Sequence, residues 1–255
     1  MKSKLEFIEG KNNILLIVPH GHPKNDMNTG KLTRKMAELL NCYAVINEYY
    51  RRPYTDKDTK EIYGTNKEAG IVDLNNIAGI RAAGMEEEFL QPIFDISKKI
   101  VGEDGMDGVI ILHIHGIGDD KFKNSKEAKP PVLVGIGRGV QEDRLSTTVE
   151  AAEQLIKKLG EDEDHPLLAR IENGGQYSGW AKHNLNQLFT GVVDPGYKDE
   201  NVQSIQLEIK YTGFRDKENL DKTANTISSA LRDIAGLNVL VAAELAEDRT
   251  EGRGV

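Results

Sequence analysis

The sequence predicts an α/β fold in which a mostly parallel, mixed sheet lies between two layers of helices. Short apolar runs rich in Ile and Val alternate with longer segments whose apolar residues recur at helical spacing. That alternation is typical of βαβ units, whose helices pack on both faces of a parallel sheet. The strongest run, residues 14–18, is apolar throughout, as expected of a strand buried on both faces.

The expected elements follow one another along the chain. Asn28 or Thr29 precedes a helix whose apolar residues recur every three or four positions up to Leu40. Pro92 lies inside the next expected helix, where it removes a backbone hydrogen bond. Gly236 follows the last expected helix, at a position where glycine commonly ends one. We expect strands at 14–18, 43–46, 109–112, 132–135 and 204–209, and further helices over 86–100, 146–159 and 223–234.

Length and composition favour a single domain over residues 1–255, with a flexible tail at 246–255. The formal net charge of −8 argues against nucleic acid or an anionic membrane as the main partner. The single cysteine, Cys42, excludes a disulfide scaffold and a thiolate-rich zinc site. No apolar run is long enough to span a membrane and no signal peptide is visible, so we expect a cytoplasmic protein. None of these features sets the oligomeric state.

Four of the six histidines form two His-x-His pairs, and each pair follows an expected strand. His20 and His22 come after the strand at 14–18, and His113 and His115 come after the strand at 109–112. Ligands of α/β sheets bind at the carboxyl ends of the strands, so both pairs are expected at one edge. Neutral imidazole is the commonest metal ligand, and a site without cysteine favours zinc held by nitrogen and oxygen.

Asp26 follows His20 on the same loop and could add a carboxylate ligand. A catalytic zinc takes about three protein ligands and keeps one position open, so not all four histidines need bind it. The others could orient the ligands through hydrogen bonds. The alternative is that these histidines are structural residues, hydrogen-bonded at the ends of strands.

The last expected strand carries polar residues on one face. Gln206, Glu208 and Lys210 alternate there with apolar residues. An edge strand with a solvated face would explain this pattern. A site carboxylate would explain it too, because Glu208 beside a metal could take a proton from water and pass it to a leaving group. The pattern leaves both explanations open.

Two glycine-rich segments are further candidates for binding. Residues 134–139 follow a strand but lack the spacing of a phosphate-binding loop, so we expect a tight turn, from which Arg138 could face the site. Residues 173–180, followed by Lys182 and His183, form either a turn packed around Trp180 or a loop that covers a substrate.

The order of these motifs over residues 12–235 resembles that of the N-formylglutamate amidohydrolase family. Each motif is short, and their shared order carries the resemblance. The matching elements are Val18-Pro19-His20-Gly21 at the end of a strand, Asp26 before a helix, Asp73-Leu74-Asn75 after an arginine pair, Leu112-His113-Ile114-His115-Gly116 at the end of another strand, and Gln206-Leu207-Glu208-Ile209 before an aromatic residue.

The resemblance implies a three-layer α/β/α, phosphorylase/hydrolase-like fold with one catalytic zinc ion. It implies a zinc-carboxypeptidase-like enzyme that hydrolyses amide bonds of small, acidic N-acyl substrates. In such an enzyme His20, Asp26 and His115 would bind zinc, and Glu208 would be the general base. The substrate carboxylate would be bound by Asn75 and by Arg51 or Arg52, since the guanidinium fork matches a carboxylate.

This sequence departs from the family pattern in two places. The family's Asp-x-Asn-Arg ends in Asn76 here, so an arginine is missing that Arg81 or Arg138 could replace. The family's Asp before the ligand histidine is His113, and His22 is an additional histidine; either could orient a ligand or bind metal, with a second zinc ion as an alternative. We therefore expect a zinc-dependent amide hydrolase of a small molecule. The alternatives are a non-catalytic or altered-specificity metal- or ligand-binding protein of the same fold, and a different metallohydrolase.

Overall fold

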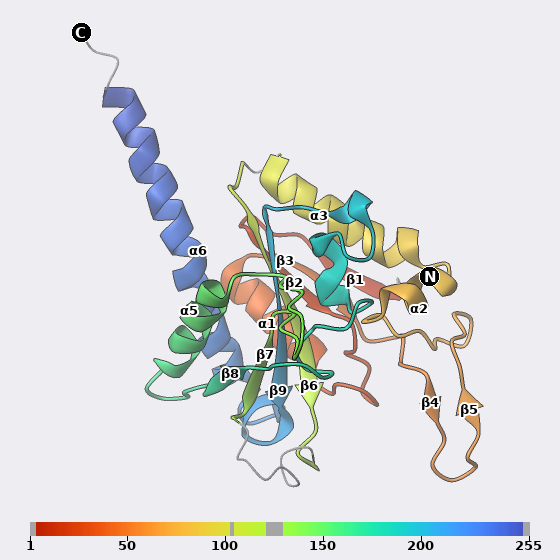
Figure 1. The fold of residues 1–255 in the computed structure, drawn as a ribbon. Helices are drawn as coiled ribbons and strands as arrows, with labels where there is room; N and C mark the ends of the chain where they lie inside the picture. Colours follow the sequence, from red (N-terminus) through yellow and green to blue (C-terminus); the bar gives the residue numbers. More distant parts are fainter. Residues whose placement is uncertain (1–3, 103–104, 121–129, 252–255) are drawn as a thin grey trace.

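A seven-stranded sheet forms the middle layer of the protein in the computed structural model, which describes residues 4–102, 105–120 and 130–251 (Figure 1). The strands lie in the order β1-β3-β2-β6-β9-β7-β8. Only two neighbouring pairs, β1–β3 and β7–β9, are antiparallel. Their bounds are β1 Leu5–Ile8, β2 Ile14–Val18, β3 Tyr43–Asn47, β6 Val109–Ile117, β7 Val132–Gly135, β8 Ala169–Ile171 and β9 Val202–Lys210. The prediction of a mostly parallel, mixed sheet is confirmed.

Helices cover both faces of this sheet (Figure 1). The helices α1 (Thr29–Leu40), α5 (Val149–Gly160) and α6 (Leu220–Glu251) share one apolar core with Leu16 of β2. The helices α2 (Ile77–Ala82) and α3 (Gln91–Gly102) share a second core with Leu15 and Ile17 of the same strand. Successive residues of β2 thus face opposite layers, which explains why the whole run is apolar.

Several element boundaries differ from the sequence prediction. The expected helix 86–100 begins as a wide π-helical turn, η1 (Glu86–Leu90). It continues without a gap into α3, in which Pro92 is the second residue. The strand β1 and the small hairpin of β4 (Tyr54–Thr55) and β5 (Ile62–Tyr63) were not expected. The expected end of the last helix at Gly236 is wrong, because α6 continues to Glu251; residues 252–255 of the expected tail lie outside the described residues.

The strand that carries Glu208 lies in the interior of the sheet. β9 pairs with β6 in parallel and with β7 in antiparallel register, so neither of its edges is free. Glu208 is 6% exposed, and Gln206 is fully buried. The interpretation of this strand as a solvated edge is therefore wrong.

Within the described part of the chain, no helix is long and apolar enough to cross a membrane.

Candidate metal centre

A cavity of about 620 Å³ lies beyond the carboxyl ends of β2, β6 and β9. His20 from the loop after β2, His115 and Gly116 from β6, and Glu208 from β9 line it. Asp26, Asp73, Asn75 and Arg52 reach the same cavity from loops. The edge of the sheet at which the sequence predicted the histidines is thus where the structure has its polar cavity.

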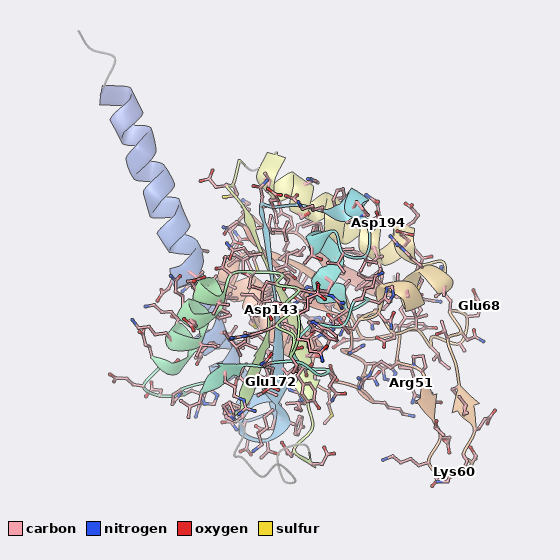
Figure 2. All side chains as sticks on the ribbon, in the orientation of Figure 1. Arg51, Lys60, Glu68, Asp143, Glu172 and Asp194 are labelled. Atoms are coloured by element: carbon pink, nitrogen blue, oxygen red, sulfur yellow. The ribbon has the colours of Figure 1, made fainter. Side chains whose placement is uncertain are left out.

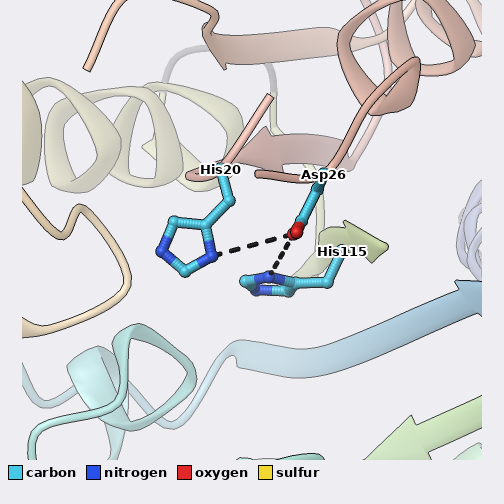
Figure 3. A group of neighbouring side chains, drawn as sticks. All are labelled: His20, Asp26 and His115. Atoms are coloured by element: carbon cyan, nitrogen blue, oxygen red, sulfur yellow. Dashed lines mark ion pairs between the residues drawn. The ribbon is translucent and has the colours of Figure 1, made fainter. Parts of the chain in front are cut away.

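His20, Asp26 and His115 converge on one point of this cavity (Figure 3). Oδ2 of Asp26 lies 3.7 Å from Nδ1 of His20 and 3.4 Å from Nδ1 of His115. One ligand atom from each residue lies within 4.8 Å of the others, and all three residues are buried. Donors of a tetrahedral zinc site, at about 2.0–2.2 Å from the ion, lie about 3.3–3.6 Å apart, which is close to the two separations measured from Asp26.

The loop after β2 is folded so that it returns Asp26 to His20. The backbone N–H of Asp26 donates to the carbonyl of His20 at 3.0 Å, which closes the loop into a compact turn. The hydroxyl of Thr29 donates to the carbonyl of Asp26 at 2.7 Å, at the start of α1. The adjacent Asn28 has a positive φ of 69°, a conformation that Asn tolerates better than most residues. The loop's own hydrogen bonds therefore help to keep His20 and Asp26, two candidate ligands, close together.

Asp73 holds His20 from the side opposite Asp26. Nε2 of His20 lies 2.7 Å from Oδ1 of Asp73, a distance at which Nε2–H donates and Nδ1 keeps a lone pair for a metal. Burial opposes ionisation of Asp73, but the hydrogen bond from His20 and the nearby positive charges keep its pKa below the usual value. Asp73 belongs to the Asp-x-Asn motif, and nothing in the sequence around it predicts this contact with His20.

The group of His20, Asp26 and His115 also contains a buried nitrogen atom without a hydrogen-bond partner among the described residues. Nε2 of His115 makes no hydrogen bond within the described residues, although the residue is 2% exposed. Burial raises the pKa of Asp26, but the hydrogen bond with His115 and the charges of His20, His115 and Arg52 outweigh it and lower that pKa to about 2. An ionised carboxylate between two imidazoles, one with an unsatisfied nitrogen, fits a divalent metal such as zinc.

Glu208 lies directly across from His115 in the register of β6 and β9. Its Oε1 accepts a hydrogen bond from Nε2 of Gln206 at 3.1 Å. Burial, followed by the negative charge of Asp26, raises the pKa of Glu208 to about 8. In the absence of a metal this carboxyl group therefore holds a proton near neutral pH, as a group that exchanges protons with a substrate must be able to do.

The remaining histidine of each His-x-His pair, His22 or His113, lies outside the group of His20, Asp26 and His115. His113 is buried, and its Nε2 lies 2.9 Å from the hydroxyl of Ser204. It sits two residues before His115 on the same strand, too deep in the sheet to line the cavity. His22 is partly exposed, and its Nδ1 accepts the backbone N–H of Lys24.

Of the arginines that the sequence suggests for substrate binding, the structure places only one in the lining of the cavity. Arg52 lines the cavity, and its guanidinium has no hydrogen-bond or ion-pair partner within the described residues. Arg51 stacks instead on the ring of Tyr54, 3.6 Å from its centroid, at the base of the projecting hairpin (Figure 2). Arg138 is exposed and does not line the cavity, and Arg81 is paired with Glu86 and Asp194.

The segment around Asn75 is joined to the chain that follows residues 173–180, for which the sequence predicts either a turn packed around Trp180 or a substrate cover. The N–H of Leu185 donates to the carbonyl of Asn75, and the N–H of Ile77 donates to the carbonyl of His183. Asn75 lines the cavity, and its buried Oδ1 makes no hydrogen bond in the described ranges. Asn76 accepts the N–H of Gly79 and caps α2, so it serves the fold where the family pattern has arginine. From the joined loop, Gln176, Tyr177, Ala181, Lys182, His183 and Asn184 also line the cavity.

No known family matches the chain, and no curated protein matches its sequence. Among solved structures, N-formylglutamate amidohydrolase from Ralstonia eutropha aligns with a TM-score of 0.53 at 10% identity, over 92% of this chain and 98% of that chain. A gene product from Agrobacterium tumefaciens aligns with a TM-score of 0.54 at 11% identity, over 94% and 96%. The chain therefore has the fold of the N-formylglutamate amidohydrolase structure, as the order of its motifs predicts.

Proposed function

We propose that the protein is a zinc-dependent hydrolase that cleaves an amide bond of a small, acidic N-acyl substrate. The observation that carries this proposal is the group of His20, Asp26 and His115 with Glu208 facing the same cavity. The fold shared with N-formylglutamate amidohydrolase supports it, because the residues occupy the strand ends at which α/β folds bind their ligands.

In this proposal His20, Asp26 and His115 hold the ion, and Asp73 fixes the orientation of His20. A zinc ion bound there would polarise the scissile carbonyl and make water a better nucleophile at neutral pH. Three protein ligands would be the number that a catalytic zinc site takes, since such a site keeps one position for water or substrate.

Glu208 moves the proton. Its carboxylate accepts a proton from the attacking water and then donates that proton to the leaving nitrogen, so one group serves both proton transfers. A divalent cation beside Asp26 favours the ionised form of Glu208 by its charge, which opposes the burial that raises the pKa of Glu208. Gln206 fixes one carboxylate oxygen, and the other remains available for the proton.

Arg52 and Asn75 bind the acidic group of the substrate. Arg52 offers an unpaired guanidinium at the cavity, and a guanidinium can hold a carboxylate by two parallel hydrogen bonds. The unpartnered Oδ1 of Asn75 accepts a substrate N–H. The alternative, a non-catalytic metal- or ligand-binding protein, is favoured by one observation: Asn76 stands where the family has arginine and is used to cap α2.

Metal analysis and a substrate panel test the proposal. We expect about one zinc per chain in the wild type, loss of that zinc in His20→Ala and His115→Ala, and retention of it in His22→Ala. Hydrolysis of N-acyl amino acids with acidic side chains should be lost in Glu208→Gln while zinc is retained. Wild-type protein without stoichiometric metal would contradict the proposed function. Zinc binding without turnover of any N-acyl amino acid would favour the binding protein instead.

A further inference from the structure

Arg215 is a buried arginine that lies behind the candidate metal centre. It ends the short turn η4 (Tyr211–Arg215), which follows β9, and it is 3% exposed. No carboxylate lies within ion-pair distance of its guanidinium in the part of the chain that the structure describes. Its hydrogen-bond partners are backbone carbonyl groups, and its Cζ lies 5.6 Å from the centroid of the Tyr211 ring.

Each of these carbonyl groups belongs to a residue one or two positions after a residue of the site. Nε of Arg215 donates to the carbonyl of Ile209, which follows Glu208, at 2.8 Å. Nη1 donates to the carbonyl of Met27, which follows Asp26. Nη2 lies 3.5 Å from the carbonyl of Ile117, two residues after His115. One guanidinium therefore connects the three segments that carry two metal ligands and the proposed base.

A second contact strengthens the connection to the loop of Asp26. Nδ2 of Asn28 donates to the backbone carbonyl of Arg215 at 2.8 Å. The side chain and the backbone of one residue thus bind the stretch between Asp26 and α1. That stretch follows the turn in which Asp26 returns to His20, so its position sets where the carboxylate ligand lies.

Gly116 provides the space that the guanidinium occupies. A Cβ atom added to Gly116 would lie 2.4 Å from Cζ of Arg215 and equally close to its two terminal nitrogens. Any side chain at position 116 would therefore displace the guanidinium. The φ of Gly116 is not in the left-handed region, so the backbone conformation does not require glycine there. The close approach of the Arg215 guanidinium does.

Burying a guanidinium is costly unless its donors are satisfied and charges of opposite sign lie nearby. The three carbonyl groups accept hydrogen bonds from Nε, Nη1 and Nη2, and Asp26 and Glu208 supply negative charge close to Arg215. An apolar side chain could fill this volume without that cost. An apolar side chain could not, however, hold three backbone segments by directed hydrogen bonds, as the planar guanidinium does.

We propose that Arg215 is a positioning residue of the metal centre, which holds Asp26, His115 and Glu208 in their relative places. The proposal rests on the proposed function, in that it assumes a metal bound by His20, Asp26 and His115. It assigns no contact between Arg215 and the metal or the substrate. Arg215 acts through the backbone of Met27, Ile117 and Ile209.

The sign of the effect on metal affinity separates positioning from a simple electrostatic role. A fixed positive charge repels a divalent cation, so its removal alone would strengthen metal binding. Loss of positioning predicts the opposite. We expect Arg215→Met to weaken zinc binding about 10- to 100-fold, the range found when groups that orient metal ligands are removed. Arg215→Lys, which keeps one donor group, should restore part of the affinity.

The experiment measures zinc affinity by chelator competition, with circular dichroism at the same temperature to show that each variant is folded. Arg232→Met is the matched control, because Arg232 also donates to a backbone carbonyl, that of Leu39, far from the cavity. Unchanged or tighter zinc binding by folded Arg215→Met would overturn the proposal. Wild-type protein that binds no zinc would instead overturn the proposed function.

Gly116→Ala provides a second test that does not depend on the folding of Arg215→Met. The added methyl group should weaken zinc binding in the wild-type background, because it displaces the guanidinium. It should have little further effect in Arg215→Lys, whose narrower ammonium group leaves room for it. Equal, additive losses in both backgrounds would show that Gly116 and Arg215 act independently, which contradicts the proposal.

Discussion

Nε2 of His20 lies 2.7 Å from Oδ1 of Asp73, a carboxylate that stands 53 positions later in the chain. This hydrogen bond makes Nδ1 the free nitrogen of His20, and Nδ1 is the atom that faces Asp26. Asp73 is held in turn by the backbone N–H of Asn75, which donates to the same oxygen at 3.0 Å. The orientation of His20, a proposed metal ligand, is thus set by a loop that also contributes Asn75 to the cavity.

Removal of the Asp73 carboxylate should therefore weaken metal binding without removing a ligand. We expect Asp73→Ala to lower zinc affinity about 10- to 100-fold, and Asp73→Asn to lower it less, because the amide oxygen can still accept from His20. Chelator competition measures both. Asp164→Ala, a change in an exposed acidic turn, is the control and should bind zinc as the wild type does. Unaltered affinity in Asp73→Ala would show that the hydrogen bond does not orient the ligand.

The metal-free protein should lose stability as the pH rises. Burial and the charge of Asp26 raise the pKa of Glu208 from 4.5 to about 8 in the folded state. The protonated form is favoured on folding, so the contribution is complete below the unfolded pKa near 4.5 and is lost as the pH rises toward 8, by at most about 1.4 kcal/mol per pH unit.

Thermal unfolding after treatment with a chelator, between pH 5 and pH 9, measures this loss. Glu208→Gln cannot ionise, so its melting temperature should fall less steeply with pH than that of the wild type. Parallel curves for the two proteins would mean that Glu208 titrates near its ordinary pKa. Added zinc should flatten the wild-type curve, because the cation compensates the buried negative charge.

His113 should make the protein sensitive to acid. Burial, followed by the charge of His115, lowers the pKa of His113 from 6.5 to about 3. The neutral form is favoured on folding, so its contribution to stability is present above pH 6.5 and is lost as the pH falls toward 3. We expect His113→Gln to unfold less steeply with acid while it keeps zinc affinity. A zinc affinity reduced as far as in His115→Gln would make His113 a ligand.

The histidine pairs illustrate what the sequence could and could not predict. Strand ends and apolar runs predicted the edge of the sheet at which His20, Asp26 and His115 lie. The alternation rule places His113 and His115 on one face of β6, but about 6.6 Å apart along the strand, so only the second reaches the cavity. Periodicity shows which face of a strand a residue lies on, but not how near the residue is to the end of the strand. It therefore could not distinguish His113 from His115.

Residues that act through long-range packing left no local signal. Arg215 follows Glu208 in an irregular turn, and nothing in its neighbourhood of sequence indicates that Met27 and Ile117 are its partners. The central place of β9 was likewise hidden, because polar residues that face a cavity and polar residues that face solvent give the same alternation. The order of strands in the sheet, which no single segment encodes, distinguishes the two.

Asn76 should contribute more to stability than to substrate binding. Its Oδ1 accepts the backbone N–H of Gly79 at 3.0 Å and caps α2. We expect Asn76→Ala to lower the free energy of unfolding by about 1 kcal/mol, the usual value of such a cap, and Asn76→Ser to restore most of it. Denaturant unfolding measures both. A large rise in KM with unaltered stability would instead assign Asn76 to the substrate.

Arg52 should determine the preference for acidic substrates. Its guanidinium lines the cavity and has no hydrogen-bond or ion-pair partner among the residues that the structure describes, whereas Arg138 is exposed and does not line the cavity. A hydrogen bond to a charged group contributes about 1.5–3 kcal/mol, so Arg52→Ala should raise KM for an acidic N-acyl substrate roughly tenfold or more and alter kcat little. Arg138→Ala is the matched control and should leave both constants unchanged. Steady-state kinetics with an acidic substrate and its neutral amide analogue measure the preference. The KM for the neutral analogue should not change in Arg52→Ala. An equal rise in KM for both substrates would assign Arg52 a role other than charge recognition.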